Sequence, residues 1–263
     1  MCHTRNIILP DIEDSEQIWR VMTFDKFMSI LEYQTLFFAR ADRLGDDLYE
    51  GHFPKSRIRG NITDISSRTS PEGEVYLDIS KSKNQELDEG SDKLHRDLAQ
   101  MQGRCLFANC WYRSKYESAS LWKTYSQGNG IAIRSTIGKL KKSFESSEYQ
   151  IYISEIKYID YNSETLPSDA IGWSFSPFIY KRIEYESEKE IRALIFFPET
   201  QENIQRFTYL NGIEVNVGPD SLIEKIYASP GSHQSFLDLV NKIMSRYKLQ
   251  KEIEKSTLSE KPT

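Results

Sequence analysis

The chain has 263 residues, 38% of them hydrophobic and 12% aromatic, a composition that excludes disordered and collagen-like proteins. Asp and Glu total 39 against 34 Lys and Arg, so the net charge of −5 gives no overall positive field for nucleic acid or an anionic membrane. No apolar run approaches the roughly 18 residues of a membrane helix, and Met1 to Pro10 lacks the order of a signal peptide. We therefore expect a globular cytoplasmic protein without membrane contacts.

The first half of the chain predicts short helices and strands. Thr23 can cap a helix, because Phe24, Phe27, Met28 and Leu31 recur at helical spacing. Further strands are expected at Leu36–Ala41, Val75–Ile79, Cys105–Trp111 and Ile131–Arg134, and further helices after Ser91, over Ser118–Tyr125 and after Thr136. Glycines and charges predict a loop over Asp42–Gly60, and polar residues an exposed insertion over Ser80–Gly90.

In the second half, Tyr149–Tyr158 alternates and predicts one long strand with a wet face. Ser176-Pro177 is typical of a helix start, and the helix is expected to run through Ile183. Asn211-Gly212 suits a type I′ turn and predicts a hairpin between Phe207–Leu210 and Ile213–Val217. Strands are also expected at Glu188–Phe197 and Leu222–Ala228, and a last amphipathic helix after Ser232.

Strands and helices are interspersed without the regular alternation of a doubly wound sheet. The order favours an α+β fold: a single domain with a mixed, mostly antiparallel sheet and short helices packed around it. We expect residues 1–18 to be an N-terminal extension and residues 19–249 the domain. Residues 250–263 form a polar segment expected to fray.

Two acids and one base stand at alternate positions of a predicted strand. Glu188, Glu190 and Arg192 should point to one face, and the next residues, Ala193–Phe197, are apolar. Carboxylates that enter such a strand need partners or a cleft. One interpretation is an exposed ion network. The other is a paired carboxylate site, in which one acid stabilises developing positive charge, such as a sugar oxocarbenium ion, and the other positions a nucleophile.

Other candidate residues also allow two interpretations. Arg20 has apolar neighbours just before the first helix, where a guanidinium is either solvated or able to bind pyrophosphate. Trp111, Trp122 and Tyr125 are either core residues or a stacking surface.

Metal ligands offer a separate set of candidates. Asp46, Asp47 and Glu50 supply oxygen atoms that suit magnesium, although a solvated turn explains the same pattern. The three cysteines and four isolated histidines fit no metal motif, so no thiolate or imidazole metal site is expected.

Taken in order, several segments resemble a broad bacterial family catalogued as domain of unknown function 2971, over Trp19 to Leu249. They are Trp19–Phe27, Leu36–Arg40 with Asp47 and Glu50-Gly51, Cys110-Trp111 with Glu117-Ser118 and Trp122, Gly130–Ile133, Lys181-Arg182 with Glu188–Arg192, and Leu222–Tyr227 with Pro230-Gly231.

A weaker similarity is to ADP-ribosyltransferases of the arginine, serine, glutamate type. In those enzymes an early arginine holds NAD, a middle strand supplies a hydroxyl residue, and a Glu-x-Glu strand holds the catalytic acid. Arg20, then Ser118 or Ser120, then Glu188-x-Glu190 follow that order.

The resemblance implies an NAD-consuming transferase or glycohydrolase, of a kind that serves as a toxin or phage-defence effector. In this hypothesis Arg20 clamps the pyrophosphate, Trp111 or Tyr125 stacks on nicotinamide, Glu190 stabilises the ribosyl cation and Glu188 orients the acceptor. The acceptor is left open between protein, nucleic acid and water. Two alternatives stay open: a metal-dependent phosphodiesterase or nuclease that uses Asp46, Asp47 and Glu50, and a non-catalytic partner-binding module.

Overall fold

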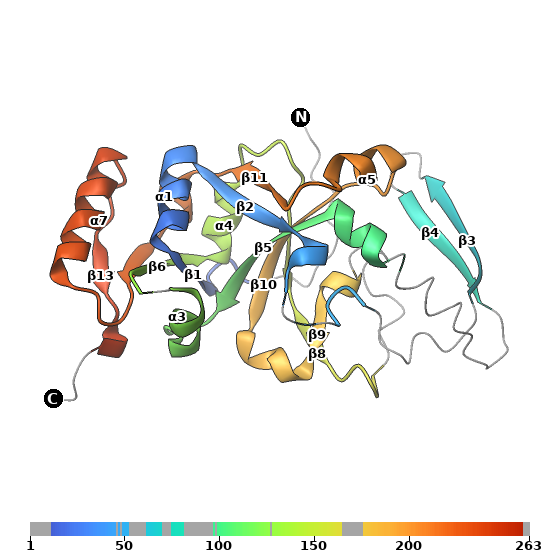
Figure 1. The fold of residues 1–263 in the computed structure, drawn as a ribbon, viewed down its shortest axis with the longest axis horizontal. Coiled ribbons are helices and arrows are strands. Elements are labelled where there is room, and N and C mark those ends of the chain that lie inside the picture. Colours follow the sequence, from blue (N-terminus) through green and yellow to red (C-terminus); the bar gives the residue numbers. More distant parts are fainter. Residues whose placement is uncertain are drawn as a thin grey trace.

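The computed structural model describes residues 12–45, 47, 49–52, 97, 99–126, 128–164 and 176–259, and the backbone alone of residues 62–69 and 75–81. Its body is a nine-stranded sheet, which Figure 1 shows running across the molecule. Seven strands follow one another in the order β11 (Gly212–Asn216), β2 (Thr35–Arg40), β5 (Leu106–Arg113), β1 (Gln17–Thr23), β6 (Gly130–Thr136), β12 (Lys225–Ala228) and β13 (Ile253–Lys255).

Two further strands extend this sheet. β10 (Glu190–Phe196) pairs with β5, and β7 (Tyr152–Glu155) pairs with β10. Every pair in this sheet is antiparallel except β12 with β13. The α+β single domain with a mostly antiparallel sheet is therefore confirmed.

One edge of β5 is shared by two strands that diverge. β10 pairs along β5 from Leu106 to Tyr112 and covers the other edge. On the shared edge, β2 pairs with residues 107–108 and β1 with residues 112–113. The backbone of residues 109–111 therefore faces a gap between β1 and β2, which we call the fork. Backbone groups in such a gap need partners other than a neighbouring strand.

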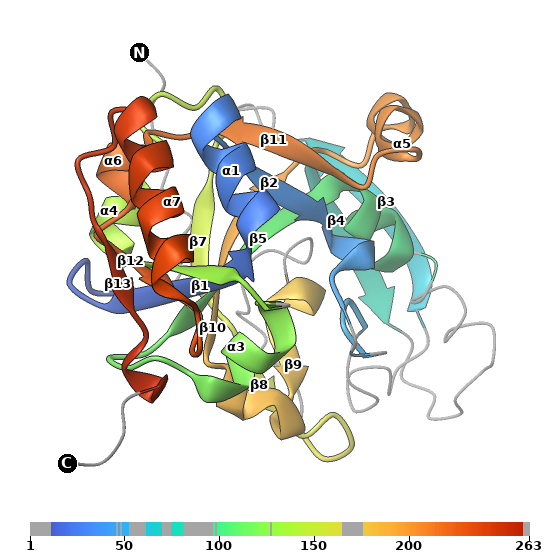
Figure 2. The ribbon, with the colours of Figure 1, turned by 60° about the vertical axis from the view of Figure 1, so that its left-hand side comes forward.

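Two layers cover the sheet. α1 (Phe24–Tyr33) and α7 (Gln234–Arg246) lie side by side on one face (Figure 2), and the rings of Phe24 and Phe236 meet at 5.5 Å. The apolar sides of both helices are buried in the largest core cluster, as helical periodicity predicts. α4 (Ile137–Ser143) and α6 (Pro219–Leu222) join the same core.

The other face carries α3 (Ala119–Tyr125) and a small parallel sheet. The smaller sheet consists of β8 (Lys157–Ile159) and β9 (Tyr180–Arg182), and it packs on even-numbered residues of β5 and β10. Further elements are η1 (Ala41–Arg43), the β3–β4 hairpin (Ile62–Thr69 and Val75–Lys81), η3 (Ser176–Phe178), η4 (Ile183–Glu188), α5 (Gln201–Phe207) and η5 (Thr257–Ser259), and residues 99–105 are also helical.

Three predictions of local structure are wrong. The strand predicted over Tyr149–Tyr158 is two strands, because after Ile156 the chain leaves β10 and pairs with β9. The helix predicted after Ser176 ends within η3, and its continuation is β9. The hairpin at Asn211-Gly212 does not form: β11 pairs with β2, and the segment before it belongs to α5.

The outer segments of the chain also differ from expectation. β1 begins at Gln17 with Ile18 fully buried, and the fraying predicted for residues 250–263 does not apply to β13 and η5. The domain limits of 19 and 249 remain a prediction. Most of the insertion predicted over Ser80–Gly90 lies outside the described residues. Among the described helices none has the length and apolar character needed to traverse a lipid bilayer.

Candidate functional site

Arg192 on β10 is the largest fully buried side chain among the described residues, and two carboxylates hold it. Its Nε and Nη2 donate to the two carboxylate oxygens of Glu190 at 2.7 and 2.9 Å, and its Nη1 donates to the carbonyl of Phe178 at 2.9 Å. Nη2 also forms an ion pair with Glu50. Burial would raise the pKa of Glu190, but Arg192 and Lys181 outweigh burial and hold that pKa at about 2. Glu190 is therefore ionised at neutral pH.

Lys181 on β9 links the two predicted acids. Its Nζ donates to Glu188 at 2.5 Å and lies 3.6 Å from Glu190. Burial lowers the pKa of Lys181, yet the two glutamates beside it leave that pKa above its ordinary value. The Glu188 side chain is 36% exposed and the Glu190 side chain 9%, so Glu188 is the acid that solvent reaches. We call Glu50, Lys181, Glu188, Glu190 and Arg192 the charged cluster.

The predicted placement of Glu188 on the strand is wrong. β10 begins at Glu190, and Glu188 is the last residue of η4. Lys189 between them has φ 41°, a left-handed conformation that ends the alternation of an extended strand. Glu190 and Arg192 do share one face, as the spacing predicts. Glu188 reaches the same neighbourhood through its contact with Lys181 instead.

The acids of the Gly45–Gly51 loop pair with arginines. The buried carboxylate of Asp47 accepts from Nε of Arg182 at 2.8 Å, and Glu50 pairs with Arg192. Asp46 lies outside the described residues. Within the described ranges no group of three or more His, Cys, Asp or Glu is arranged to hold a metal ion. Guanidinium groups stand where the magnesium hypothesis needs a cation, so the geometry disfavours that alternative.

Arg20 on β1 reaches into the fork. Its strand neighbours Ile18 and Met22 point into the core under α1 and α7, the opposite face from Glu190. The Arg20 Nη1 donates to the carbonyl of Cys110 at 2.5 Å, which brings the guanidinium into the gap in the sheet. Burial lowers the pKa of Arg20, and the neighbouring ionisable groups Cys110, Tyr125 and Glu190 oppose that effect. The charge of Glu190 thus acts on Arg20, although the two side chains leave the sheet on opposite faces.

No carboxylate within the described residues forms an ion pair with Arg20. The recorded ion pairs connect other bases, such as Arg40, Arg113 and Arg134, to their acids. A guanidinium carries five N–H donors in a planar fork, and one of them is used by the Cys110 carbonyl. The arrangement therefore leaves positive charge and donors for an anionic ligand.

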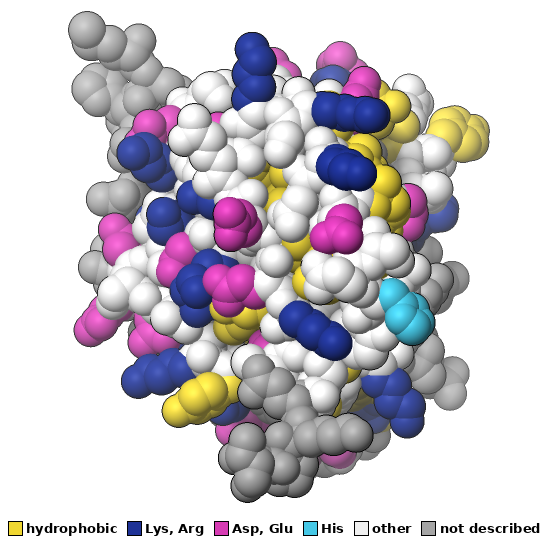
Figure 3. Space-filling view, turned by 90° about the vertical axis from the view of Figure 1, so that its left-hand side faces the viewer, with side chains coloured by type: hydrophobic (Ala, Val, Ile, Leu, Met, Phe, Trp, Pro, Cys, Tyr) yellow, Lys and Arg dark blue, Asp and Glu magenta, His cyan; other side chains and the backbone are white. Residues whose placement is uncertain are grey.

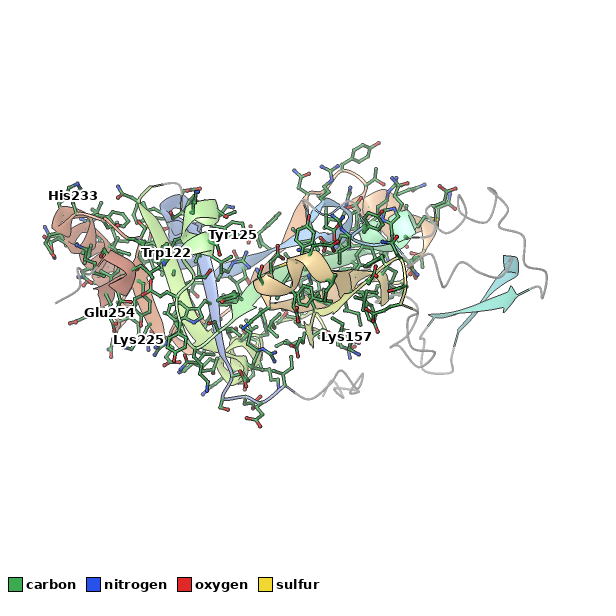
Figure 4. All side chains as sticks on the ribbon, turned by 90° about the horizontal axis from the view of Figure 1, so that it is seen from below. Trp122, Tyr125, Lys157, Lys225, His233 and Glu254 are labelled. Carbon is green, nitrogen blue, oxygen red and sulfur yellow. The ribbon has the colours of Figure 1, made fainter. Side chains whose placement is uncertain are left out.

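Three weakly acidic side chains surround the charged cluster. Burial, followed by Glu190, raises the pKa of the Cys110 thiol well above its ordinary value, so the thiol is protonated at neutral pH. The Tyr158 oxygen accepts from the backbone N–H of Glu190 at 2.8 Å, and burial is the main reason that its pKa is about 12. Tyr125, the last residue of α3, is 51% exposed, and burial together with Glu188 and Glu190 raises its pKa. Figure 4 shows Tyr125 and Trp122 together on α3.

Three other predicted site residues have structural contacts. Trp111 is 2% exposed and donates from Nε1 to Asn109 at 2.7 Å, and its ring lies 6.0 Å from the guanidinium of Arg20. Ser118 is the N-cap of α3 and accepts from the Leu121 N–H at 3.3 Å. The hydroxyls of Ser118 and Ser120 are 2.8 Å apart. The Trp111 ring thus lies next to the Arg20 guanidinium. Ser118 begins the helix that carries Tyr125.

Sequence reasoning gave no role to Lys181, Tyr158 or Cys110. Lys181 follows an apolar run and precedes the two acids, a signal that becomes useful only once β9 is known to lie beside β10. Tyr158 and Cys110 lie on strands with many similar residues and carry no distinguishing pattern. Tyr158 is 32 positions from Glu190 in sequence, and Cys110 comes close to Glu190 through the pairing of β5 with β10, so no local signal encodes their proximity.

The surface at the α7 and β13 end carries basic and acidic side chains interspersed with small apolar areas (Figure 3). Among the described residues of that face, opposite charges therefore alternate instead of forming one basic surface. This agrees with the net charge of −5.

No family model matches the chain, so the resemblance to domain of unknown function 2971 is not confirmed. No curated protein matches it. Among solved structures, the chain is similar to "Thermus sp. 2.9 DarT in complex with ADP-ribosylated ssDNA", with 10% identity and a TM-score of 0.36 over 95% of this chain and 97% of that chain. A TM-score this low does not establish a shared fold, and the similarity assigns no role to any residue of this chain.

Proposed function

We propose that this chain is an NAD-consuming, ADP-ribosyltransferase-like enzyme that acts as a transferase or as a glycohydrolase. The proposal rests on the arrangement of the charged and aromatic side chains around the fork. A guanidinium without a carboxylate partner among the described residues interacts electrostatically there with Glu190 and with the half-exposed Tyr125, and Tyr125 in turn interacts with Glu188 and Glu190. Those groups complement the anionic pyrophosphate, the cationic ribosyl carbon and the flat nicotinamide ring of NAD.

Arg20 is the proposed pyrophosphate ligand. It lies in the gap between β1 and β2, so a substrate placed across the fork meets its unused donors. Tyr125 is the proposed stacking partner for nicotinamide, because its ring is half-exposed and its hydroxyl interacts electrostatically with Glu188 and Glu190. Trp111 is buried and therefore serves this proposal through its contact with Arg20.

The geometry favours an exchange of the roles first given to the two glutamates. Glu190 is buried and its charge is already balanced by Arg192 and Lys181. Glu188 is the more exposed acid and has Lys181 as its partner. We propose that Glu188 contacts the substrate and that Glu190 balances the charges of Lys181 and Arg192.

In the proposed reaction the bond between the ribosyl carbon and the nicotinamide nitrogen breaks, and nicotinamide leaves with the electron pair. The Glu188 carboxylate stabilises the positive charge that develops on the ribosyl carbon. Water, or a nucleophile on a protein or nucleic acid, then attacks that carbon and loses its proton. A role as a cytoplasmic toxin or phage-defence effector is part of the same proposal.

The test is nicotinamide release from NAD by the purified chain. We expect release by the unchanged protein and a fall in kcat of about 100-fold or more in Glu188→Gln, because the stabilising charge is lost. Glu145→Gln, an exposed acid after α4, is the matched control and should retain full activity. Absence of release by the unchanged protein, or full activity in Glu188→Gln, would contradict the proposal.

A further inference from the structure

One carboxylate joins the segment Ile253–Ser259 to the helix that carries Tyr125. Glu117 lies just before α3, and its Oε2 accepts from Nε1 of Trp122 at 2.9 Å. Its Oε1 accepts from both the backbone N–H and the hydroxyl of Thr257, each at 3.1 Å. Glu117 therefore uses both oxygens to connect two elements 140 positions apart in sequence.

The segment that holds Thr257 is itself fixed to the main sheet. β13 pairs in parallel with β12, and the N–H of Ser256 donates to the carbonyl of Ala228 at 3.2 Å. Ser256 is 1% exposed, so this attachment is part of the packed interior. Lys225 and Glu254, labelled in Figure 4, form an ion pair at 2.7 Å on the outer side of the same strand pair. Thr257, which accompanies this attached strand, therefore offers Glu117 hydrogen-bond donors in a fixed position.

α3 is a short helix, and one of its side chains packs against the main sheet. It has seven residues, and Trp122 is its buried side chain, packed with Trp19, Ala132 and Tyr227. The indole Nε1 of Trp122 has Glu117 as its acceptor. Tyr125 lies three residues further on, near the same side of the helix, and Glu188 and Glu190 act electrostatically on its hydroxyl. A change in the orientation of Trp122 therefore moves Tyr125 relative to Glu188 and Glu190.

We propose that Glu117 is a positioning residue that ties the segment Ile253–Ser259 to α3 and so holds Tyr125 over the charged cluster. The connection runs from β12 and β13 through Thr257 and Glu117 to Trp122 and then Tyr125. The catalytic consequence rests on the proposed function, because it requires Tyr125 to contact the substrate. The structural connection itself does not.

The experiment measures the ionisation of Tyr125 directly in the full chain. Tyrosine labelled with carbon-13 at Cζ is titrated by NMR, and the Tyr125 signal is assigned by its loss in Tyr125→Phe. In the unchanged protein, burial and the two glutamates keep the pKa of Tyr125 above its ordinary value. Glu117→Ala removes the link, and we expect that pKa to fall toward its ordinary value while the fold is retained. Glu145→Ala should leave the titration unchanged.

A second measurement separates this inference from the proposed function. If the protein releases nicotinamide, Glu117→Ala should raise the KM for NAD about tenfold or more, with a smaller change in kcat, because a misplaced Tyr125 weakens binding. If the unchanged protein releases none, the proposed function fails and the Tyr125 titration still decides the connection. An unchanged Tyr125 titration in Glu117→Ala would overturn the inference. Should that variant fail to fold, Glu117→Gln decides in the same way, because an amide has a single acceptor oxygen and cannot accept from both Trp122 and Thr257.

Discussion

The interaction between Glu190 and Arg192 shows how much a single buried charge depends on its partner. Both side chains are almost fully buried, and the bidentate contact with Glu190 is supplemented by Glu50. A buried ion pair contributes little compared with apolar packing, but removal of one partner leaves a charge in a low-dielectric interior. The pair is therefore a requirement of the fold at this position, whether or not Glu190 also acts in a reaction.

Glu190→Gln is expected to destabilise the protein by about 3 kcal/mol, because Arg192 stays buried with Glu50 as its remaining carboxylate. Urea unfolding followed by circular dichroism gives the free energy of unfolding. Glu202→Gln, at an exposed position of α5, is the control and should change it by less than about 0.5 kcal/mol. A loss of less than about 1 kcal/mol in Glu190→Gln would show that Arg192 does not depend on this partner.

At the scale of the element, periodicity located those segments whose neighbours in space agree with their own pattern. α1 forms over Phe24–Tyr33, β5 over Leu106–Arg113 and α3 over Ala119–Tyr125, each within a few residues of the prediction. In these segments the apolar spacing and the burial favour the same structure, and in α3 the Ser118 cap does so as well, whereas the Thr23 side chain makes no cap hydrogen bond to α1. Local signals were sufficient there.

The local signals failed where the choice of strand partner decides the outcome. Asn211-Gly212 is a strong turn signal, yet β11 forms its hydrogen-bonded pair with β2, whose edge is available. Phe207 meanwhile packs against Phe107 and Phe197 at ring distances of 5.0 and 4.7 Å, which holds α5 in place. The free energy gained by burying aromatic rings from distant segments exceeds the free energy of a local turn preference.

The N-cap of α3 provides a test that separates stability from substrate binding. Ser118→Ala removes the acceptor for the Leu121 N–H and should cost about 1 kcal/mol of unfolding free energy. Ser118→Asp keeps an acceptor at the cap and should retain most of that stability. If both variants raise the KM for NAD equally while their stabilities differ, Ser118 contacts the substrate as the ADP-ribosyltransferase resemblance implies. If KM follows stability, the serine acts through the helix.

For the whole molecule, the sequence placed Arg20 and the two acids in a suggestive order but could not show how they meet. The opening that Arg20 reaches depends on the divergence of β1 and β2 along one edge of β5, a property of the assembled sheet. The partners of the acids, Lys181 and Arg192, come from β9 and β10, and β9 was predicted as helix. The sequence therefore suggested the candidate residues, but it did not predict their ion-pair partners or how far each side chain is exposed.

The stability of the whole molecule should depend on acid through Glu190. Its pKa is about 2 in the folded protein against an ordinary value of 4.5, so its contribution is complete above about pH 4.5 and is lost as the pH falls toward 2. At neutral pH this linkage is worth about 3 kcal/mol. The difference in unfolding free energy between the unchanged protein and Glu190→Gln should therefore shrink between pH 7 and pH 3. A difference that is constant over this range would contradict the low pKa of Glu190.

The claim that Arg20 serves an anionic dinucleotide at the fork is tested most directly by the equilibrium binding of ADP-ribose, which carries the pyrophosphate but cannot release nicotinamide. Isothermal titration should show binding to the unchanged protein and a Kd at least about tenfold weaker for Arg20→Met, because the bidentate charge-assisted contacts are lost. Arg246→Met, at an exposed position of α7, should bind as the unchanged protein does. No binding to the unchanged protein, or equal binding by Arg20→Met, would contradict the account.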